Sequence, residues 1–274
     1  MSVLLKNLRN GALTLTLNRP DVRNACSAEM AFDLLDSLNQ AAADPEVRAV
    51  VITGAGGSFC AGGDLRALGS ADPRDPVAAR LDSDPIMAQL EQRVHRIVTS
   101  GQITTLLHTM GKPTIAVVRG AAAGMGVALA AACDFRIVSD TAFFKTAFAT
   151  IGVSGDLGCS YYLHRLIGPA RAREIMMFSD RIQADAALQM GLVTKVVEDA
   201  QLDAESTAFI DRLAQGPTVA YRYIKKNLIA ADAANLQAYL ELEARNTYRC
   251  FETQDAKEAV QAFLDKRTPQ FVGR

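Results

Sequence analysis

The five cysteines of this 274-residue chain form no C-x-x-C pair. They are odd in number and scattered, at Cys26, Cys60, Cys133, Cys159 and Cys250. Such a set is not a disulfide framework and indicates a reducing compartment. Because the N-terminal MSVLLKNLRNG also lacks the pattern of a secretory signal, we expect a cytoplasmic protein.

Charge of one sign is not in excess, and long apolar runs are missing. Lys and Arg total 29 against 30 Asp and Glu, which gives a formal net charge of −1. This balance excludes a strongly basic nucleic-acid footprint, so no nucleic-acid partner is expected. Apolar runs such as residues 121–133 are too short to span a bilayer, so no membrane partner is expected either.

Motifs that hold metals, nucleotides or a nucleophilic serine are also missing. The three histidines, His95, His108 and His164, are too far apart to suggest a metal site. The glycine-rich residues 54–65 match neither G-x-G-x-x-G nor G-x-x-x-x-G-K-[ST], and no G-x-S-x-G occurs. The sequence therefore predicts neither a metal nor a resident cofactor.

The patterns that are present divide the chain into two regions. Strand-like runs such as residues 11–18 and 113–118 alternate with helical segments in the first two thirds of the sequence. Ser27 is predicted to cap a helix over about residues 28–43, the Asp-, Pro- and Arg-rich residues 69–85 predict a surface loop, and a long helix is expected to follow to about Met110. From residue 202 onward the pattern is helical, with helices predicted over 202–215, 218–230, 236–251 and 255–264. The sequence therefore predicts an α/β core over residues 1–198 and a helical region over residues 199–274.

Two turns of small residues each follow an apolar strand: GAGGSFCAGGDL at 54–65 and RGAAAGMG at 119–126. Small residues let backbone N–H groups approach a ligand, and a helix start near Gly124 would leave N–H donors unpaired. Such donors suit a developing negative charge, so the second turn is a candidate oxyanion hole. The first turn alone favours a plain glycine-rich loop, but the two together can present N–H groups to one carbonyl oxygen.

Carboxylates are scarce around the second turn. Between Pro113 and Arg165 the acidic residues are Asp134, Asp140 and Asp156, with no Glu. Acid–base chemistry in this region must therefore use very few groups. Asp134 is expected to be structural, since it separates a helix from a strand. From the residue pattern alone, Asp156 is as well explained as an N-cap of the following helix as it is by a catalytic role.

The segments FCAGGDL at 59–65 and KPTIAVVRGAAAGMGVALAAACDF at 112–135 resemble the crotonase superfamily, also called the enoyl-CoA hydratase/isomerase family. The similarity runs from TLTLNRP at 14–20 to FLDKRTPQF at 263–271. The resemblance implies an α/β fold, a spiral of ββα units with a C-terminal helical trimerisation region. It also implies a homotrimer or a dimer of trimers, with an acyl-CoA thioester as substrate and no further cofactor.

By position, the resemblance implies that the N–H groups of Gly63 and Met125 bind the thioester oxygen while an enolate forms. Loss of one such donor typically costs about 2.7–4 kcal/mol of transition-state stabilisation. Further substrate-binding positions implied in the same way are Arg23, Ala61, Gly62, Asp64, Leu65, Gly124, Ala128, Phe148, Phe263 and Lys266.

The positions at the CoA end have a plain alternative. Arg23 resembles a basic CoA contact, and Phe263 and Lys266 resemble residues that touch CoA from a neighbouring subunit. An ordinary amphipathic helix with Phe263 turned inward explains the last two equally well. Asp64 is expected to anchor its loop, and His108 to be a packing residue.

Two departures from the family pattern bear on the reaction. The hydratases of the family commonly use two glutamates, where this chain has Ala128 and Phe148, and neither residue transfers a proton. Asp156, in IGVSGDLG, aligns with an Asp that family isomerases use as a proton shuttle, and AFATIGVSGD resembles the ring-1,2-epoxyphenylacetyl-CoA isomerase subgroup. We therefore predict isomerisation of an unsaturated acyl-CoA with Asp156 as acid/base. The alternatives are an atypical hydratase and a non-catalytic acyl-CoA-binding or RNA-binding scaffold.

Overall fold

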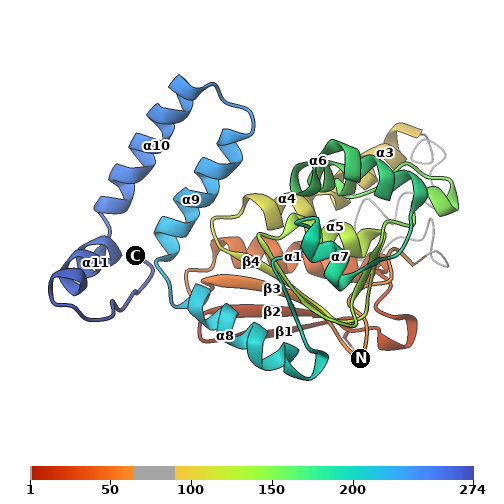
Figure 1. The fold of residues 1–274 in the computed structure, drawn as a ribbon, viewed down its shortest axis with the longest axis horizontal. Coiled ribbons are helices and arrows are strands. Elements are labelled where there is room, and N and C mark those ends of the chain that lie inside the picture. Colours follow the sequence, from red (N-terminus) through yellow and green to blue (C-terminus); the bar gives the residue numbers. More distant parts are fainter. Residues whose placement is uncertain (1, 65–89) are drawn as a thin grey trace.

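A six-stranded mixed sheet forms the centre of the computed structural model, which describes residues 2–64 and 90–274 (Figure 1). The first pair of strands is antiparallel and every other pairing in this sheet is parallel. In sheet order the strands are β1 (Leu4–Arg9), β2 (Ala12–Leu17), β3 (Ala49–Gly54), β4 (Thr114–Val118), β6 (Phe135–Ser139) and β9 (Lys195–Val197).

A second, three-stranded sheet lies beside the first. It consists of β5 (Ala121–Ala123), β7 (Phe143–Lys145) and β8 (Ile182–Gln183). β5 pairs with β7 in parallel, and β7 pairs with β8 antiparallel. Since β5 comes three residues after β4 in the chain, the polypeptide passes from one sheet to the other at the second small-residue turn.

The central strands are buried on both faces because helices cover both. Val50 and Ile52 of β3 belong to the larger core cluster, whereas Val51 belongs to a separate cluster with Leu202 and Ala214 of α8 (Leu202–Ala214). This alternation is the period of two of a β-strand. A parallel sheet covered in this way shows near-continuous apolar strands such as AVVITG.

The helices of the larger core cluster surround one short buried helix. The first, α1, is capped as predicted by Ser27, whose hydroxyl accepts a hydrogen bond from Met30 N at 3.2 Å. In chain order these helices are α1 (Ala28–Ala43), α4 (Gln102–Thr109), α5 (Met125–Ala132), α6 (Cys159–Phe178) and α7 (Ala184–Gln189). A further helix, α3 (Leu90–Ser100), precedes α4 and has no buried residue. All eight residues of α5 are buried, so its position is fixed by close packing on every side.

Within the described residues, three short 3-10 helices connect these elements: η1 (Pro20–Val22), η3 (Ala149–Ile151) and η4 (Asp199–Gln201). The long helix predicted to end near Met110 consists, where described, of α3 and α4, which adjoin at Gly101. Within α6 the chain kinks at Gly168, whose φ of 75° and ψ of 165° are not helical. The surface loop predicted at residues 69–85 lies outside the described residues.

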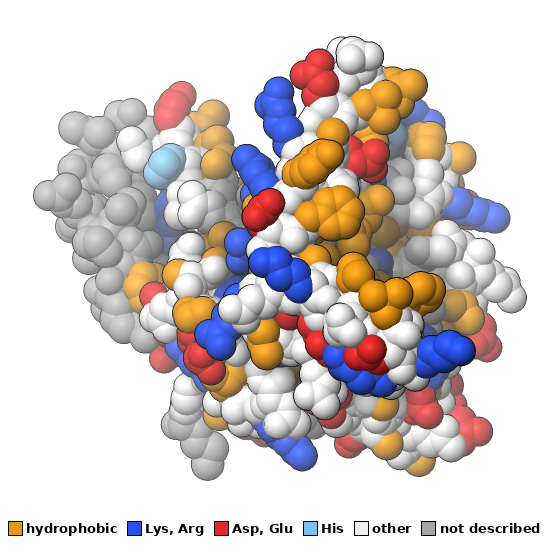
Figure 2. Space-filling view, turned by 90° about the vertical axis from the view of Figure 1, so that its left-hand side faces the viewer, with side chains coloured by type: hydrophobic (Ala, Val, Ile, Leu, Met, Phe, Trp, Pro, Cys, Tyr) orange, Lys and Arg blue, Asp and Glu red, His pale blue; other side chains and the backbone are white. Residues whose placement is uncertain are grey.

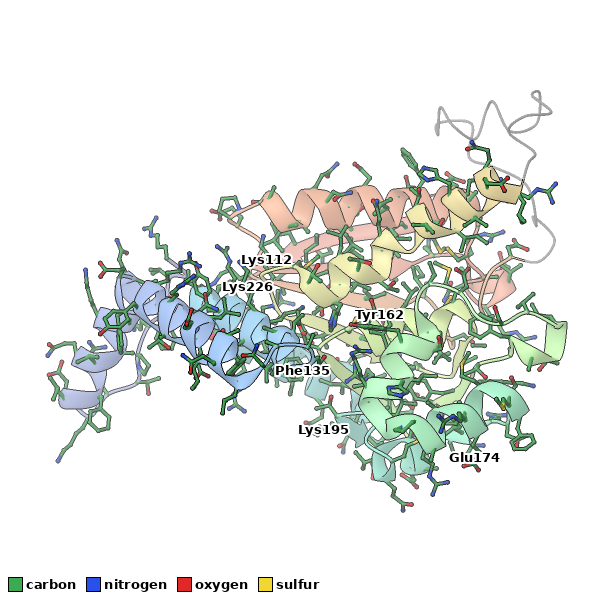
Figure 3. All side chains as sticks on the ribbon, turned by 90° about the horizontal axis from the view of Figure 1, so that it is seen from above. Lys112, Phe135, Tyr162, Glu174, Lys195 and Lys226 are labelled. Atoms are coloured by element: carbon green, nitrogen blue, oxygen red, sulfur yellow. The ribbon has the colours of Figure 1, made fainter. Side chains whose placement is uncertain are left out.

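The last three helices form an arm that projects from the core (Figures 1 and 3). They are α9 (Thr218–Ala231), α10 (Leu236–Phe251) and α11 (Gln254–Leu264), and each lies within one residue of its predicted bounds. The chain end returns to the base of the arm, where Arg48 donates to Gly216 O at 2.6 Å and Phe271 O at 3.2 Å. Although α8 follows residue 198, it packs on the sheet, whereas the arm begins with α9.

Candidate active site

Backbone hydrogen bonds hold the two small-residue turns against each other. Cys60 N donates to Ala121 O at 2.9 Å, and Ala123 N donates to Cys60 O at 2.8 Å. Cys60 and Ala122 therefore form a parallel bridge between segments that are sixty residues apart in the sequence. The residues that follow on each side, Gly62 and Gly124, consequently become neighbours.

Glycine is favoured at this contact by the backbone conformation of both residues. A Cβ on Gly124 would lie 3.7 Å from Gly62 Cα, and the φ of Gly124 is +48°. Gly62 has a φ of +108° and would place a Cβ 3.3 Å from Ala123 O. Both glycines have positive φ angles that residues with a Cβ atom rarely adopt.

Among the described residues, the N–H groups of Gly63 and Met125 are two unpaired donors at this junction. Met125 is the first residue of α5, so its N–H has no acceptor within the helix. Gly63 is flanked by bonds to Cys26, which donates to Gly62 O at 2.8 Å and accepts from Asp64 N at 2.9 Å. The N–H of Gly63 itself therefore points away from Cys26, and neither donor has an acceptor within the described residues.

Polar side chains anchor the first turn. Asp64 forms an ion pair with Arg19 at 2.8 Å, which fits the anchoring role expected of this carboxylate. Asn24 is fully buried, and its amide nitrogen donates to Ala55 O at 2.9 Å and to Ser58 O at 2.7 Å. No motif in the sequence marks Asn24 as a site residue. Its only signal is an Asn directly after a strand and turn, a residue type that tolerates the φ of +56° found here.

Asp156 is half-buried between η3 and α6, and its Oδ1 accepts a hydrogen bond from Leu157 N at 2.6 Å. Burial raises the pKa of this carboxyl above its usual range, although the bond from Leu157 lowers it in part. The pKa of the Cys26 thiol is raised by burial, by Cys60 and by the charge of Asp156. The charge of Asp156 therefore acts on Cys26, which pairs with Gly63 of the first turn.

The alternative interpretation of Asp156 as a helix N-cap is wrong. α6 begins at Cys159, its N-cap is Gly158, and no side chain caps it. Leu157 and Gly158 both have left-handed backbones, with φ of 51° and 70°, so the chain turns twice before the helix starts. A left-handed leucine costs of order 1–3 kcal/mol, and such strain is typically retained at functional sites.

Apolar side chains lie beside the second turn. Phe148 is buried, and a Cβ on Gly124 would lie 4.0 Å from its Cε1 atom. Ala128 is fully buried within α5, and the side chain of Met125 is also buried. The exposed Arg23 adjoins the same turn through its carbonyl, which accepts from Ala61 N at 2.9 Å. Leu65 lies outside the described residues.

The two predicted CoA contacts near the C-terminus lie on the arm, away from the two turns. Phe263, the last residue but one of α11, has 81% of its surface exposed, so the expectation that it turns inward is wrong for the single chain. The residues of α11 that are buried are Asp255 and Ala262. Asp255 accepts hydrogen bonds from Val272 N and Gly273 N, so the returning tail occupies that side of the helix.

His108 packs against aromatic rings, as expected of a packing residue. Its ring meets those of Tyr161 and Tyr162 edge-on, with centroids 6.4 and 5.4 Å apart. Burial lowers its pKa, and its Nε2 atom has no hydrogen-bond partner among the described residues. With Asp134 and Lys225 it lines a cavity of about 500 Å³ between the core and α9.

Among the described residues, no group of three or more His, Cys, Asp or Glu side chains is placed to hold a metal ion. No helix in the same part of the chain has both the length and the apolar character needed to cross a membrane.

Known proteins resemble this chain along its whole length. The model of the family described as Enoyl-CoA hydratase/isomerase matches residues 7–274. A Rhodobacter capsulatus protein named "Probable enoyl-CoA hydratase" is 36% identical over 97% of this chain and 96% of its own. The 1,2-epoxyphenylacetyl-CoA isomerase of Escherichia coli K12 is 33% identical over 100% of both chains. The crystal structure of an enoyl-CoA hydratase from Polaromonas sp. JS666, 34% identical, has a TM-score of 0.85 and covers 98% of this chain and 99% of that one.

The chain therefore belongs to the enoyl-CoA hydratase/isomerase family and has the crotonase fold, as the sequence motifs predicted.

Proposed function

We propose that this protein isomerises an unsaturated acyl-CoA through a thioester enolate, with Asp156 as its acid/base group. The observation that carries the proposal is the pairing of two turns with unbonded N–H groups and one half-buried carboxylate nearby. The family relationship supports the acyl-CoA thioester as substrate class.

The chemistry follows from where charge develops. Removal of a proton from the acyl chain moves negative charge onto the thioester oxygen, where the N–H groups of Gly63 and Met125 would stabilise it. Asp156 would take that proton from one carbon and return it to another while the double bond shifts. No atom is gained or lost, so one carboxylate is sufficient and no second acid is required.

The raised pKa of Asp156 suits this exchange. A carboxyl that is partly removed from water holds its proton more strongly and is a better base when ionised. The apolar surfaces of Phe148 and Ala128 support the same reading, because they supply no group to activate water. The hydratase names among the relatives favour the second candidate, an atypical hydratase in which Asp156 alone positions water.

For the CoA end we propose Arg23 as a contact beside the first turn and Phe263 and Lys266 as contacts from a neighbouring subunit. This requires a homotrimer or a dimer of trimers. Figure 2 shows hydrophobic side chains gathered on the projecting arm. The exposed large apolar residues of the arm are Ile224, Leu228, Leu236, Leu240, Tyr248, Phe251, Val260, Phe263 and Leu264. Such a surface suits a protein interface, and sedimentation velocity of the purified chain measures the assembly.

The reaction is tested by hydrogen exchange from deuterated water into the α- and γ-carbons of a panel of acyl-CoA thioesters. Wild-type protein should exchange both positions, and Asp156→Asn should not. Asp180→Asn is the matched control, because Asp180 is an exposed carboxylate of the core outside the site. Exchange that survives in Asp156→Asn would remove Asp156 from the mechanism.

The same preparation separates the alternatives. Hydration of crotonyl-CoA at ordinary hydratase rates, lost in Asp156→Ala, would favour the atypical hydratase. A protein that binds acyl-CoA but leaves the whole panel unchanged would be a scaffold.

A further inference from the structure

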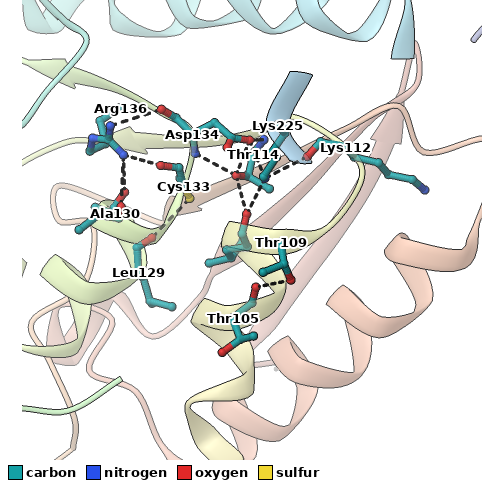
Figure 4. A network of polar contacts seen from close by, with 12 residues as sticks. Thr105, Thr109, Lys112, Thr114, Leu129, Ala130, Cys133, Asp134, Arg136 and Lys225 are labelled. Atoms are coloured by element: carbon teal, nitrogen blue, oxygen red, sulfur yellow. Dashed lines mark hydrogen bonds and ion pairs between the residues drawn. The ribbon is translucent and has the colours of Figure 1, made fainter. Parts of the chain in front are cut away.

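Arg136 lies buried at the end of α5 that is opposite to Met125, with 5% of its surface exposed. Its Nη1 atom donates to the carbonyl oxygens of Ala130 at 3.2 Å, Ala131 at 3.5 Å and Cys133 at 2.5 Å. Figure 4 shows the guanidinium closing this end of the helix.

The guanidinium has two further acceptors. Nε donates to Leu192 O at 2.6 Å and Nη2 donates to Asp134 O at 3.3 Å. Within the described residues, the guanidinium therefore donates to main-chain carbonyls and to no side chain. Most of these carbonyls belong to the last turn of α5 or to the residues directly after it. Arginine remains protonated in proteins, so a full positive charge is buried here without a carboxylate bonded to it.

A buried cation without a bonded carboxylate is costly, and its acceptors explain why it is stable here. The last four carbonyls of a helix have no intrahelical partner, and they carry the negative end of the helix dipole. Arg136 supplies donors to three such oxygens and offsets that negative charge. The opposite end of the same helix carries the N–H of Met125, which the proposed mechanism directs at the enolate oxygen.

The two ends of α5 are rigidly related. Eight residues of α-helix span about 12 Å, and all eight residues of α5 are buried. The helix carries no charged side chain, so contacts at its two ends are the polar interactions that fix its axial position. A shift at the carbonyl end would therefore move the N–H of Met125 by a similar amount.

We infer that Arg136 is a positioning residue for the oxyanion hole, which holds α5 by its C-terminal carbonyls and keeps the N–H of Met125 directed at the thioester oxygen. The inference rests on the proposed function, because it gives Arg136 a role in enolate stabilisation. The charge of Arg136 contributes as well. At about 12 Å and an effective dielectric constant of about 20, loss of a unit positive charge removes enough stabilisation of a developing anion to slow the reaction about tenfold.

The chain contains a close match to this arrangement that lacks the catalytic connection. Lys112 is also buried, and its Nζ atom donates to Ala41 O and Asp44 O at the C-terminal end of α1. It is therefore a second buried cation bonded to the carbonyls of a helix end. Since α1 carries neither of the two N–H donors, Lys112→Gln controls for the general cost of losing such a cation.

The experiment measures the oxyanion hole directly, without turnover. Butyryl-CoA labelled with ¹³C at the thioester carbonyl is bound to the full-length protein, and the carbonyl stretch is recorded by isotope-edited infrared spectroscopy. Donors at the oxygen polarise the carbonyl and lower this frequency. We compare wild type with Arg136→Gln, which removes the charge, with Arg136→Lys, which keeps it, and with Lys112→Gln.

Wild type and Lys112→Gln should shift the carbonyl equally. Arg136→Gln should lose most of that shift and about tenfold in kcat for proton exchange, with KM changed less than threefold. Arg136→Lys should retain most of both. If Arg136→Gln does not fold, Arg136→Lys remains decisive: a shift as small as that of a free thioester would overturn the role of the charge.

The outcomes separate this inference from the proposed function. A wild-type protein that binds butyryl-CoA without any carbonyl shift would contradict the oxyanion hole itself. A shift in wild type that is fully preserved in Arg136→Gln would leave the proposed function intact and overturn the role of Arg136. A loss of shift that is equally large in Lys112→Gln would also overturn it, because it would reflect general destabilisation.

Discussion

Gly126 lies so close to Cys60 that a side chain cannot be placed between them: a Cβ on Gly126 would stand 2.4 Å from the carbonyl oxygen of Cys60. Through this contact the first turn of α5 packs directly against the first small-residue turn, residues 54–65. The Gly126→Ala variant must therefore separate the two turns that carry Gly63 and Met125. We expect a loss of at least 100-fold in the rate of α-proton exchange, together with about 1–3 kcal/mol of stability from overpacking. Exchange kinetics and denaturant unfolding measure the two effects.

Gly57 provides the control for this prediction. It lies on the same glycine turn, yet a Cβ there would meet nothing within 4 Å. Gly57→Ala should therefore keep both the exchange rate and the stability of the wild type. Equal rates in Gly126→Ala and wild type would show that the seating of α5 on Cys60 has no bearing on activity.

The pH dependence of exchange should report the environment of Asp156. Burial raises the pKa of this carboxyl, and only the ionised form can accept a proton from the acyl chain. The rate, as kcat/KM, should therefore rise with pH through a midpoint above the ordinary aspartate value of about 3.9. An acidic limb centred at or below that value would contradict the assignment, and a limb unchanged in Asp156→Asn would assign it to another group.

The same raised pKa has a consequence for stability with a definite sign. A carboxyl whose pKa is higher in the folded than in the unfolded state favours folding while it is protonated, and this contribution is lost as the pH rises through the folded pKa. At neutral pH the ionised Asp156 therefore destabilises the fold. Asp156→Asn keeps an oxygen that can accept from Leu157 N, so it should be more stable than wild type at pH 7.

Urea unfolding at several pH values tests this sign. The advantage of Asp156→Asn should shrink as the pH falls below the ordinary aspartate pKa, where the wild-type carboxyl is neutral as well. A variant that is less stable than wild type at pH 7 would indicate that the ionised carboxylate is held by favourable contacts.

Much of the fold follows from local pattern. Ser27 caps α1 where the sequence predicts it, and the helices after residue 200 match their periodicity within one residue. The two glycine turns were also identified, together with the family motifs that they carry. Their mutual contact depends on the bridge between Cys60 and Ala122, which joins distant segments and leaves no local signal.

Other features escaped prediction for physical reasons. Asp156 looked like an N-cap because the left-handed conformation of Leu157, which delays the helix, is rare for leucine and is not encoded in the residue type. Arg136 and Lys112 bond to main-chain carbonyls, which every residue possesses, so no partner residue marks their positions. The exposure of Phe263 depends on the tail that packs on the other side of α11.

The arm is joined to the core by an ion pair that should be strongly coupled. Lys225 of α9 contacts Asp134 at 2.7 Å with 10% of its side chain exposed, and it also donates to Leu107 O at 2.9 Å (Figure 4). Asp134 in turn accepts from Thr114 N at 2.8 Å, which confirms its structural role. Removal of one member of a buried pair leaves the other charge uncompensated and typically costs about 3–5 kcal/mol.

A double-mutant cycle measures this coupling. Lys225→Met should destabilise the protein by about 3–5 kcal/mol, and the combination of Lys225→Met with Asp134→Asn should cost less than the sum of the single changes. The exposed pair of Arg171 and Glu174, 3.1 Å apart on α6, is the control, and its disruption should change stability by less than about 1 kcal/mol. Strict additivity of the Lys225 and Asp134 changes would mean that the two charges do not stabilise each other, and that α9 is held to the core by its apolar contacts and by the bonds of Lys225 to main-chain carbonyls.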